Sequence, residues 1–123
     1  MRRFILISSA ALSMLAVGCA SPQSVCETGV KNACAKVFEC SEESVKSSDA
    51  FKAIYGASAA ECETKMMTAA KCSEKKEFNE MCTDGKEYDL GKASECSDAV
   101  KAQSCADFND ATKRPAACAE VCK

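Results

Sequence analysis

Cysteine is the residue type in this sequence whose number and spacing could carry chemistry, since eleven of the 123 residues are cysteine. Redox catalysis of the thioredoxin kind needs two cysteines separated by two residues at a helix start, and structural zinc sites need closely spaced cysteine or histidine pairs. Neither spacing occurs: Cys118 and Cys122, with three residues between them, come nearest, and the chain contains no histidine. We therefore expect disulfides rather than a redox site, and we expect no metal site and no cofactor.

Ten of the cysteines follow Cys19 and form an even set, which can pair completely in an oxidising compartment. We expect all ten to be disulfide-bonded: Cys26, Cys34, Cys40, Cys62, Cys72, Cys82, Cys96, Cys105, Cys118 and Cys122. The sequence alone does not choose the partners. Cys118 and Cys122 lie four residues apart on one helix face, so each should pair with another element. If the first two helices are antiparallel neighbours, Cys40 approaches Cys62 and Cys34 approaches Cys72.

The remaining polar and sulfur-bearing residues give no catalytic constellation. Met66, Met67 and Met81 could form a soft copper site beside cysteine, but methionine at helical spacing more often fills a core. The acidic residues that stand close together are expected to cap helices or face solvent: Glu42, Glu43, Glu61, Glu63, Asp107 and Asp110. No serine-hydrolase elbow, phosphate-binding loop or metalloprotease motif occurs. The sequence therefore predicts a protein that is not an enzyme.

The charges nearly balance, with 16 basic and 18 acidic side chains and a net charge of −2. A nucleic-acid-binding domain is usually basic or carries a basic stripe. A mild negative charge also opposes electrostatic docking to anionic lipid. We therefore expect no nucleic-acid partner.

Helical periodicity runs through almost the whole chain after residue 25. Apolar residues and the cysteines at positions 26, 34 and 40 fall on one face over residues 26–40, as in an amphipathic helix. Residues 44–49 are expected to form a loop. A short helical piece should end at Gly56, and a second helix should begin after a capping box made by Ser58 and Glu61.

The second half of the chain repeats this pattern in shorter pieces. A helical segment around Phe78 should stop at Asp84 and Gly85, a longer helix should span residues 89–103, and a last one should open at Pro115 and carry Cys118 and Cys122. Large apolar residues are few, so burial alone would give a weak core. We therefore predict an all-α fold: a small disulfide-stapled bundle of four to five short helices.

The N-terminus has the pattern of a secretory signal peptide. Arg2 and Arg3 precede an apolar run over residues 4–17, followed by small residues. The run is shorter than the roughly 20 residues that a membrane span needs. We expect residues 1–18 to be a signal peptide.

Residues 15–19, with the sequence LAVGC, resemble the lipobox of bacterial lipoproteins. The resemblance implies a diacylglyceryl thioether on Cys19 and a further amide-linked acyl chain such as palmitate, which together anchor the protein stably to a membrane. Residues 19–25 would then be the lipidated N-terminus and a tether, and residues 26–123 the cysteine-rich helical domain. Ala16 and Gly18 also satisfy ordinary signal peptidase, which would release a soluble secreted protein instead.

The signal together with the cysteine-rich helical body is similar to the small cysteine-rich lipoproteins of predatory Gram-negative bacteria. By this resemblance, and because Ala20 rather than Asp follows the cysteine, the protein would be lipid-anchored in the cell envelope, at the outer membrane, facing the periplasm or the surface. The function implied is a noncatalytic binding or structural module with an envelope protein as its partner. The alternative is a soluble secreted disulfide-rich effector, either an inhibitor or a toxin.

Overall fold

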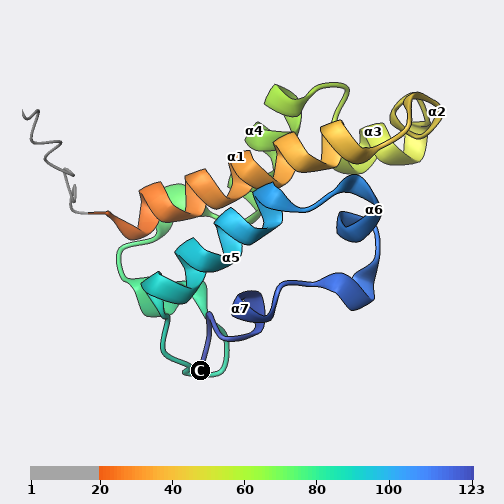
Figure 1. Cartoon of the computed structure of the whole chain (residues 1–123). Coiled ribbons are helices and arrows are strands. Elements are labelled where there is room, and N and C mark those ends of the chain that lie inside the picture. The colour runs from red at the N-terminus through yellow and green to blue at the C-terminus, as the bar shows by residue number, and fades with distance from the viewer. Residues whose placement is uncertain (1–19) are drawn as a thin grey trace, which may run out of the picture.

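The protein is all-helical in the computed structural model, which describes residues 20–123 (Figure 1). The helices are α1 (Pro22–Cys40), α2 (Glu43–Lys46), α3 (Asp49–Tyr55), α4 (Ala59–Ala69), α5 (Leu90–Ala102), α6 (Cys105–Phe108) and α7 (Ala116–Ala119), with three 3-10 helices, η1 (Cys72–Glu74), η2 (Phe78–Met81) and η3 (Ala111–Lys113). The predicted all-α, disulfide-stapled fold is confirmed, although α2, α6 and α7 are single turns of four residues. No helix among the described residues is both long enough and apolar enough to cross a membrane. The expected signal peptide (residues 1–18) and Cys19 lie outside these residues.

Helix α1 begins earlier than its cysteine pattern suggests. Ser21 caps it: its hydroxyl accepts the backbone N–H of Ser24, and the Ser24 hydroxyl accepts the backbone N–H of Ser21. Pro22 follows at the first helical position, where its missing N–H costs nothing. The tether expected over residues 19–25 is therefore wrong for its last four residues, which belong to the folded domain.

Two short helices connect α1 to α4. The expected loop over residues 44–49 is wrong, because α2 occupies its first three residues and α3 already begins at Asp49. Gly56 ends α3 with a φ of +84°, as predicted for a left-handed stop. The Ser58 hydroxyl caps α4 by accepting the N–H of Glu61, but the Glu61 carboxylate accepts the N–H of Ala57 instead of closing the box on Ser58.

The core lies where α1, α3 and α4 meet. Helix α4 runs antiparallel to α1, and the least exposed side chains in the described chain are cysteines at this contact, with Cys34, Cys62 and Cys72 each 1% exposed. Phe51 on α3 extends the core: its ring packs edge-on to Phe38, with ring centroids 5.3 Å apart. A small core made largely of disulfides follows from the shortage of large apolar residues.

Helix α5 lies beside α1 and runs parallel to it (Figure 1). It spans nearly the residues predicted, with the Asp89 carboxylate accepting the N–H of Lys92 at its start. Its contacts with α1 keep a constant offset of 65 residues: Asn32 donates a hydrogen bond to Ser97, and Lys36 donates one to the Lys101 carbonyl. The same offset continues just beyond α5, where Cys40 is bonded to Cys105 at the start of α6. The C-terminal half of α1 therefore packs parallel to α5 with a constant register.

The chain ends against the turn that precedes α5. Asp84 and Gly85 both have positive φ and form the predicted stop after η2. Glu87 and Lys123 exchange two backbone hydrogen bonds of 2.8 and 3.0 Å, beside the bridge of Tyr88 with Cys122. Because α7 ends at Ala119, the expectation that Cys118 and Cys122 share a helix face is wrong.

Candidate functional site

All ten cysteines of the described chain form disulfides. The pairs are Cys26–Cys72, Cys34–Cys62, Cys40–Cys105, Cys82–Cys122 and Cys96–Cys118. Cys118 and Cys122 each pair with a different element, as their positions predicted. The ten cysteines therefore cross-link helices and turns that lie far apart in the sequence.

The pairings predicted between the first two long helices are wrong. Antiparallel α1 and α4 were expected to join Cys40 to Cys62 and Cys34 to Cys72, whereas Cys62 meets Cys34 and Cys72 meets Cys26. The predicted pairing places the start of α4 beside the end of α1. With α2 and α3 in the connection, α4 starts about two turns further back along α1, or roughly 10 Å at 1.5 Å per residue.

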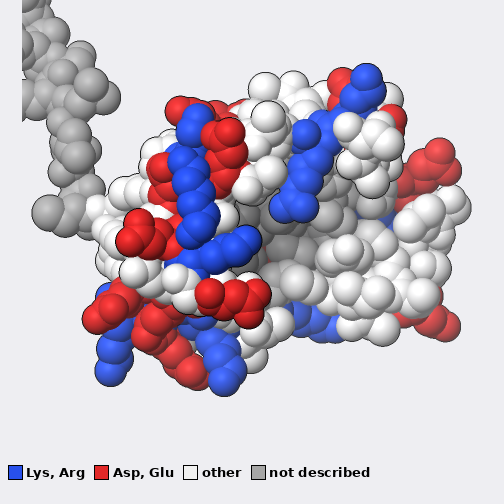
Figure 2. Space-filling view, turned by 90° about the horizontal axis from the view of Figure 1, so that it is seen from below, with Lys and Arg blue, Asp and Glu red and all other residues white. Residues whose placement is uncertain are grey.

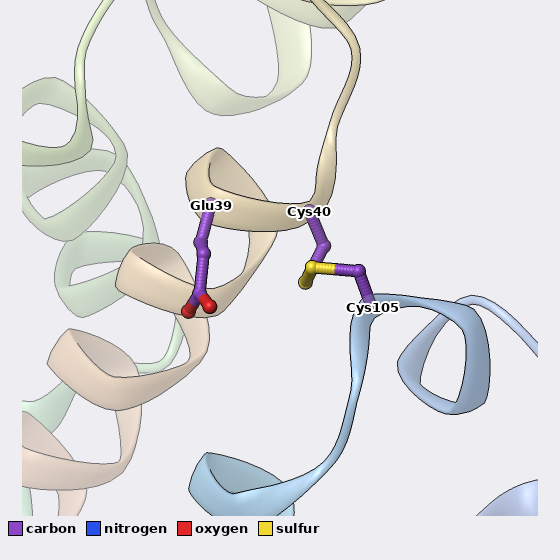
Figure 3. Close-up of side chains that lie close together, drawn as sticks. All are labelled: Glu39, Cys40 and Cys105. Atoms are coloured by element: carbon purple, nitrogen blue, oxygen red, sulfur yellow. A yellow bond between two sulfur atoms is a disulfide. The ribbon is translucent and has the colours of Figure 1, made fainter.

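One group of side chains in the described chain has the composition of a metal site (Figure 3). Ligand atoms of Glu39, Cys40 and Cys105 lie within 4.8 Å of one another. The two sulfur atoms are bonded to each other, and the thiolate is the form that binds metal. The Glu39 carboxylate also faces the Lys36 ammonium at 3.4 Å. The cluster is a disulfide beside an ion pair.

The acidic residues considered as catalytic candidates largely cap helix ends. Glu61 accepts a backbone N–H ahead of α4, Asp107 pairs with the Ser104 hydroxyl at the start of α6, and Asp110 accepts the N–H of Thr112 at η3. Each carboxylate is exposed and accepts a hydrogen bond from a residue within four positions of it in the sequence.

A groove with a volume of about 650 Å³ lies between the N-terminal halves of α1 and α5. At the 65-residue offset, Val25 stands opposite Leu90 and Thr28 opposite Ala93, and there the helices leave space between them. Met81 of η2 also lines the groove. A groove of this size falls in the range of small-molecule sites, which are mostly apolar.

The two ends of the groove differ in chemistry. Near residue 20 its lining is small and uncharged, with Ala20, Val25 and Gly29 on one side beside the hydroxyls of Ser24 and Thr28. At the other end, Asn32 and Ser97 bridge the helices with a 2.8 Å hydrogen bond, and charged side chains follow on α5. The apolar end is therefore the part suited to a hydrophobic ligand.

Tyr88 joins this groove to a second, smaller hollow of about 300 Å³. Burial raises the pKa of the Tyr88 phenol above its ordinary value, and the ring stacks on Phe78 with centroids 5.6 Å apart. In the smaller hollow, the Lys123 ammonium lies 3.4 Å from the Asp89 carboxylate. The backbone N–H of Lys92, followed by Lys123, lowers the pKa of Asp89.

No sequence pattern predicts the groove. The cysteines of α1 mark its core face, and the groove runs along the edge of that face at Cys26 and over the neighbouring positions Val25, Gly29 and Asn32, which form no strong pattern. Met81 was weighed as core filler or a copper ligand and is a half-buried groove residue instead. On the face shown in Figure 2, basic and acidic side chains are interspersed.

No known protein family, curated protein or solved structure matches this chain.

Proposed function

We propose that the protein is a membrane-anchored lipoprotein, lipidated at Cys19, that acts as a noncatalytic binding or structural module of the cell envelope. The observation that carries this proposal is the cysteine pairing. Every cysteine between residues 20 and 123 has a partner within the same stretch, and Cys19 is the eleventh cysteine of the sequence. A thioether at Cys19 gives that residue a role that needs no second cysteine.

The compact disulfide-bonded body supports an extracytoplasmic site of action. Five disulfides in 104 described residues suit an oxidising compartment. Helix α1 begins at Pro22, so only Ala20 and Ser21 separate Cys19 from the domain. An anchor so close to a helix would hold the domain against the bilayer, which favours binding to another envelope component over free diffusion.

The groove between α1 and α5 favours binding over a purely structural role. It is a preformed, largely apolar hollow on a body cross-linked by disulfides, which is the usual character of a small-ligand site. The partner that we propose for the module as a whole is an envelope protein.

The intact mass of the mature protein, taken from its native host with and without reduction and alkylation, tests this proposal. We expect a chain that starts at Cys19 and carries a lipid increment, with ten cysteines alkylated only after reduction. The protein should also stay with the membrane fraction after a high-salt wash.

A Cys19→Ser variant is the matched control, because it removes the only atom that could carry the thioether and leaves all five disulfides in place. It should lose the lipid increment. An unlipidated wild-type mass, with the protein in the soluble fraction, would replace this proposal with the secreted inhibitor or toxin. Cysteines beyond Cys19 that react before reduction would contradict the disulfide-stapled body.

A further inference from the structure

The apolar end of the groove between α1 and α5 begins at the first residue that the structure describes. Ala20 lines it, and along α1 it is followed by Val25 and Gly29. Leu90 and Ala93 of α5 form the opposite side. Cys19 is joined to Ala20 by a single peptide bond, which places consecutive Cα atoms about 3.8 Å apart. A group attached to residue 19 is therefore tethered at the mouth of the groove.

The lining near this mouth suits a hydrocarbon chain. Aliphatic side chains from both helices line it, together with the uncharged hydroxyl-bearing residues Ser24, Thr28 and Tyr88. Leu90 keeps 41% of its surface exposed at the rim although it is a large apolar residue. The hydrogen bond between Asn32 and Ser97 bounds this part, which therefore covers nearly three turns of α1 and two turns of α5. No charged side chain of the described groove lies before Asp98 and Lys101, which line it beyond that bridge.

Gly29 leaves room that no protein atom fills. A Cβ added at this position would meet no atom within 4 Å, although glycine in a helix interior is less favourable than alanine. Position 29 lies four residues after Val25, so the two share a face of α1. The packing of the protein does not require a glycine here, whereas a ligand lying in the groove would use the space.

We propose that the groove holds one acyl chain of the lipid on Cys19. The seated chain depends on the proposed lipidation of Cys19, and it adds a position for one of the acyl chains. Two acyl chains are enough for stable membrane anchoring, so a third can be held by the protein while the others remain in the bilayer. The seated chain fixes the orientation of the domain, with the first turns of α1 and α5 toward the membrane surface.

Photo-crosslinking of the intact lipoprotein tests this. The native host is fed a diazirine analogue of palmitic acid so that the lipid on Cys19 carries the photoreactive group. The purified lipoprotein in detergent, and the same protein in host membranes, are irradiated, reduced, digested and mapped by mass spectrometry. We expect intramolecular crosslinks from the lipidated N-terminal peptide to residues 25–29 and 90–93.

Gly29→Leu should abolish most of these crosslinks, because the new side chain would project into the groove from a position where an added Cβ meets no protein atom within 4 Å. Displacing contacts worth about two methylene groups should lower the occupancy about tenfold. Ala35→Leu is the matched control: it adds the same side chain to an exposed position of α1 that does not line the groove, and it should leave the yield unchanged. Ala93→Leu repeats the test from α5 if the first variant does not form its five disulfides.

The outcomes separate the two proposals. A mass without lipid on Cys19 before irradiation would overturn the lipoprotein assignment and the seated chain with it. A lipidated mass whose crosslinks reach only membrane lipid, or whose yield Gly29→Leu leaves unchanged, would overturn the seated chain alone. Crosslinks between two copies of the protein would assign the groove to a dimer contact instead.

Discussion

The described chain divides into two regions that carry the same number of cysteines and very different cores. The N-terminal region, residues 22–74, and the C-terminal region, residues 75–123, each contain five cysteines, with two internal disulfides apiece and Cys40–Cys105 joining them. The buried hydrophobic residues of the described chain all lie in the N-terminal region. In the C-terminal region, apart from α5, the elements are single turns and 3-10 helices.

The difference shows that disulfides stabilise the N-terminal and C-terminal regions in different ways. In the N-terminal region the Cys34–Cys62 bridge is itself core, because both residues are 1% exposed and packed among helices. In the C-terminal region Cys82–Cys122 is half-exposed and holds a chain end to a turn. The first should stabilise by packing as well as by cross-linking, and the second mainly by restricting the unfolded chain.

The largest expected effect is removal of the buried bridge. The double variant Cys34→Ala, Cys62→Ala loses the constraint on a loop of 28 residues, about 3 to 4 kcal/mol, and leaves a cavity in the core. A total on the order of 5 kcal/mol approaches the whole stability of a small domain. We therefore expect the far-ultraviolet circular dichroism of the variant to show largely unfolded chain at room temperature.

Cys82→Ala, Cys122→Ala is the matched control for that experiment. Its loop of 40 residues predicts a similar entropic loss but little cavity cost. Hydrogen exchange should show protection kept over residues 22–74 and lost near the C-terminus. Equal global unfolding in the two double variants would contradict the comparison between the regions.

A smaller effect is expected from the aromatic residues. Phe51 is 7% exposed and contacts Phe38 and Tyr55, so Phe51→Ala should lower the free energy of unfolding by about 3 to 4 kcal/mol. Phe78 stacks on Tyr88 but stays half-exposed, so Phe78→Ala should cost only about 1 kcal/mol. Urea denaturation of both variants measures the two values, and a Phe78→Ala cost as large as that of Phe51→Ala would mean that the C-terminal region has a core of its own.

Partial reduction should separate the two regions by rate. A reductant reaches a half-exposed disulfide without unfolding, whereas a buried one requires the surrounding structure to open. We expect Cys82–Cys122 to be reduced at least about tenfold faster than Cys34–Cys62, a difference of about 1.4 kcal/mol in activation free energy. Alkylation and peptide mapping at successive times gives the order, and simultaneous loss of both bridges would indicate one cooperative unit.

The smallest effect is expected from acid. Three carboxyl groups, all in the C-terminal region, have a lowered pKa: Glu80, Asp89 and Asp110. Backbone N–H groups cause the largest part of the lowering for Glu80 and Asp89, and the Thr112 hydroxyl does so for Asp110. A carboxyl group whose pKa is lower in the folded than in the unfolded state stabilises the fold at any pH above its unfolded-state pKa of about 4. This stabilisation is lost as the pH falls through the folded-state pKa.

The melting temperature should therefore fall between pH 5 and pH 2, with the C-terminal region loosening first. A triple variant, Glu80→Gln, Asp89→Asn, Asp110→Asn, should show a smaller fall over the same range. Thermal unfolding followed by circular dichroism at several pH values tests this. An equal fall in the variant would place the acid sensitivity in other carboxyl groups.

The local elements were predictable where a strong terminal signal marked them. Asp89 before α5, Gly56 after α3 and Ser58 before α4 all lie at the ends that the sequence indicated, because capping depends on residues within one turn. The start of α1 differs from the prediction, which places Ser21 and Ser24 in a tether. Two serines three residues apart can instead form a capping box, in which each hydroxyl accepts the backbone N–H of the other. The lipid on Cys19 stays a prediction.

The candidate site was much less predictable than the helices. Helical periodicity placed Cys34 on the core face of α1, but it carried no information on which turn of α4 would meet it. Val25 and Leu90 line one groove from positions 65 residues apart, and neither residue belongs to a motif. Contacts over such a separation depend on how the connecting segments fold.

The sequence by itself determined that this protein is helical and that its ten cysteines after Cys19 can all pair, because periodicity, caps and an even number of thiols are local or arithmetic properties. The tertiary structure alone decided which cysteines pair and that α1 and α5 leave an apolar groove beside Ala20. Both depend on how the helices are aligned along one another. Helices α2 and α3 shift α4 along α1 and so decide which cysteines meet. The parallel alignment of α1 with the chain from α5 onward, set by Asn32–Ser97 and Cys40–Cys105, decides where α1 and α5 leave space between them.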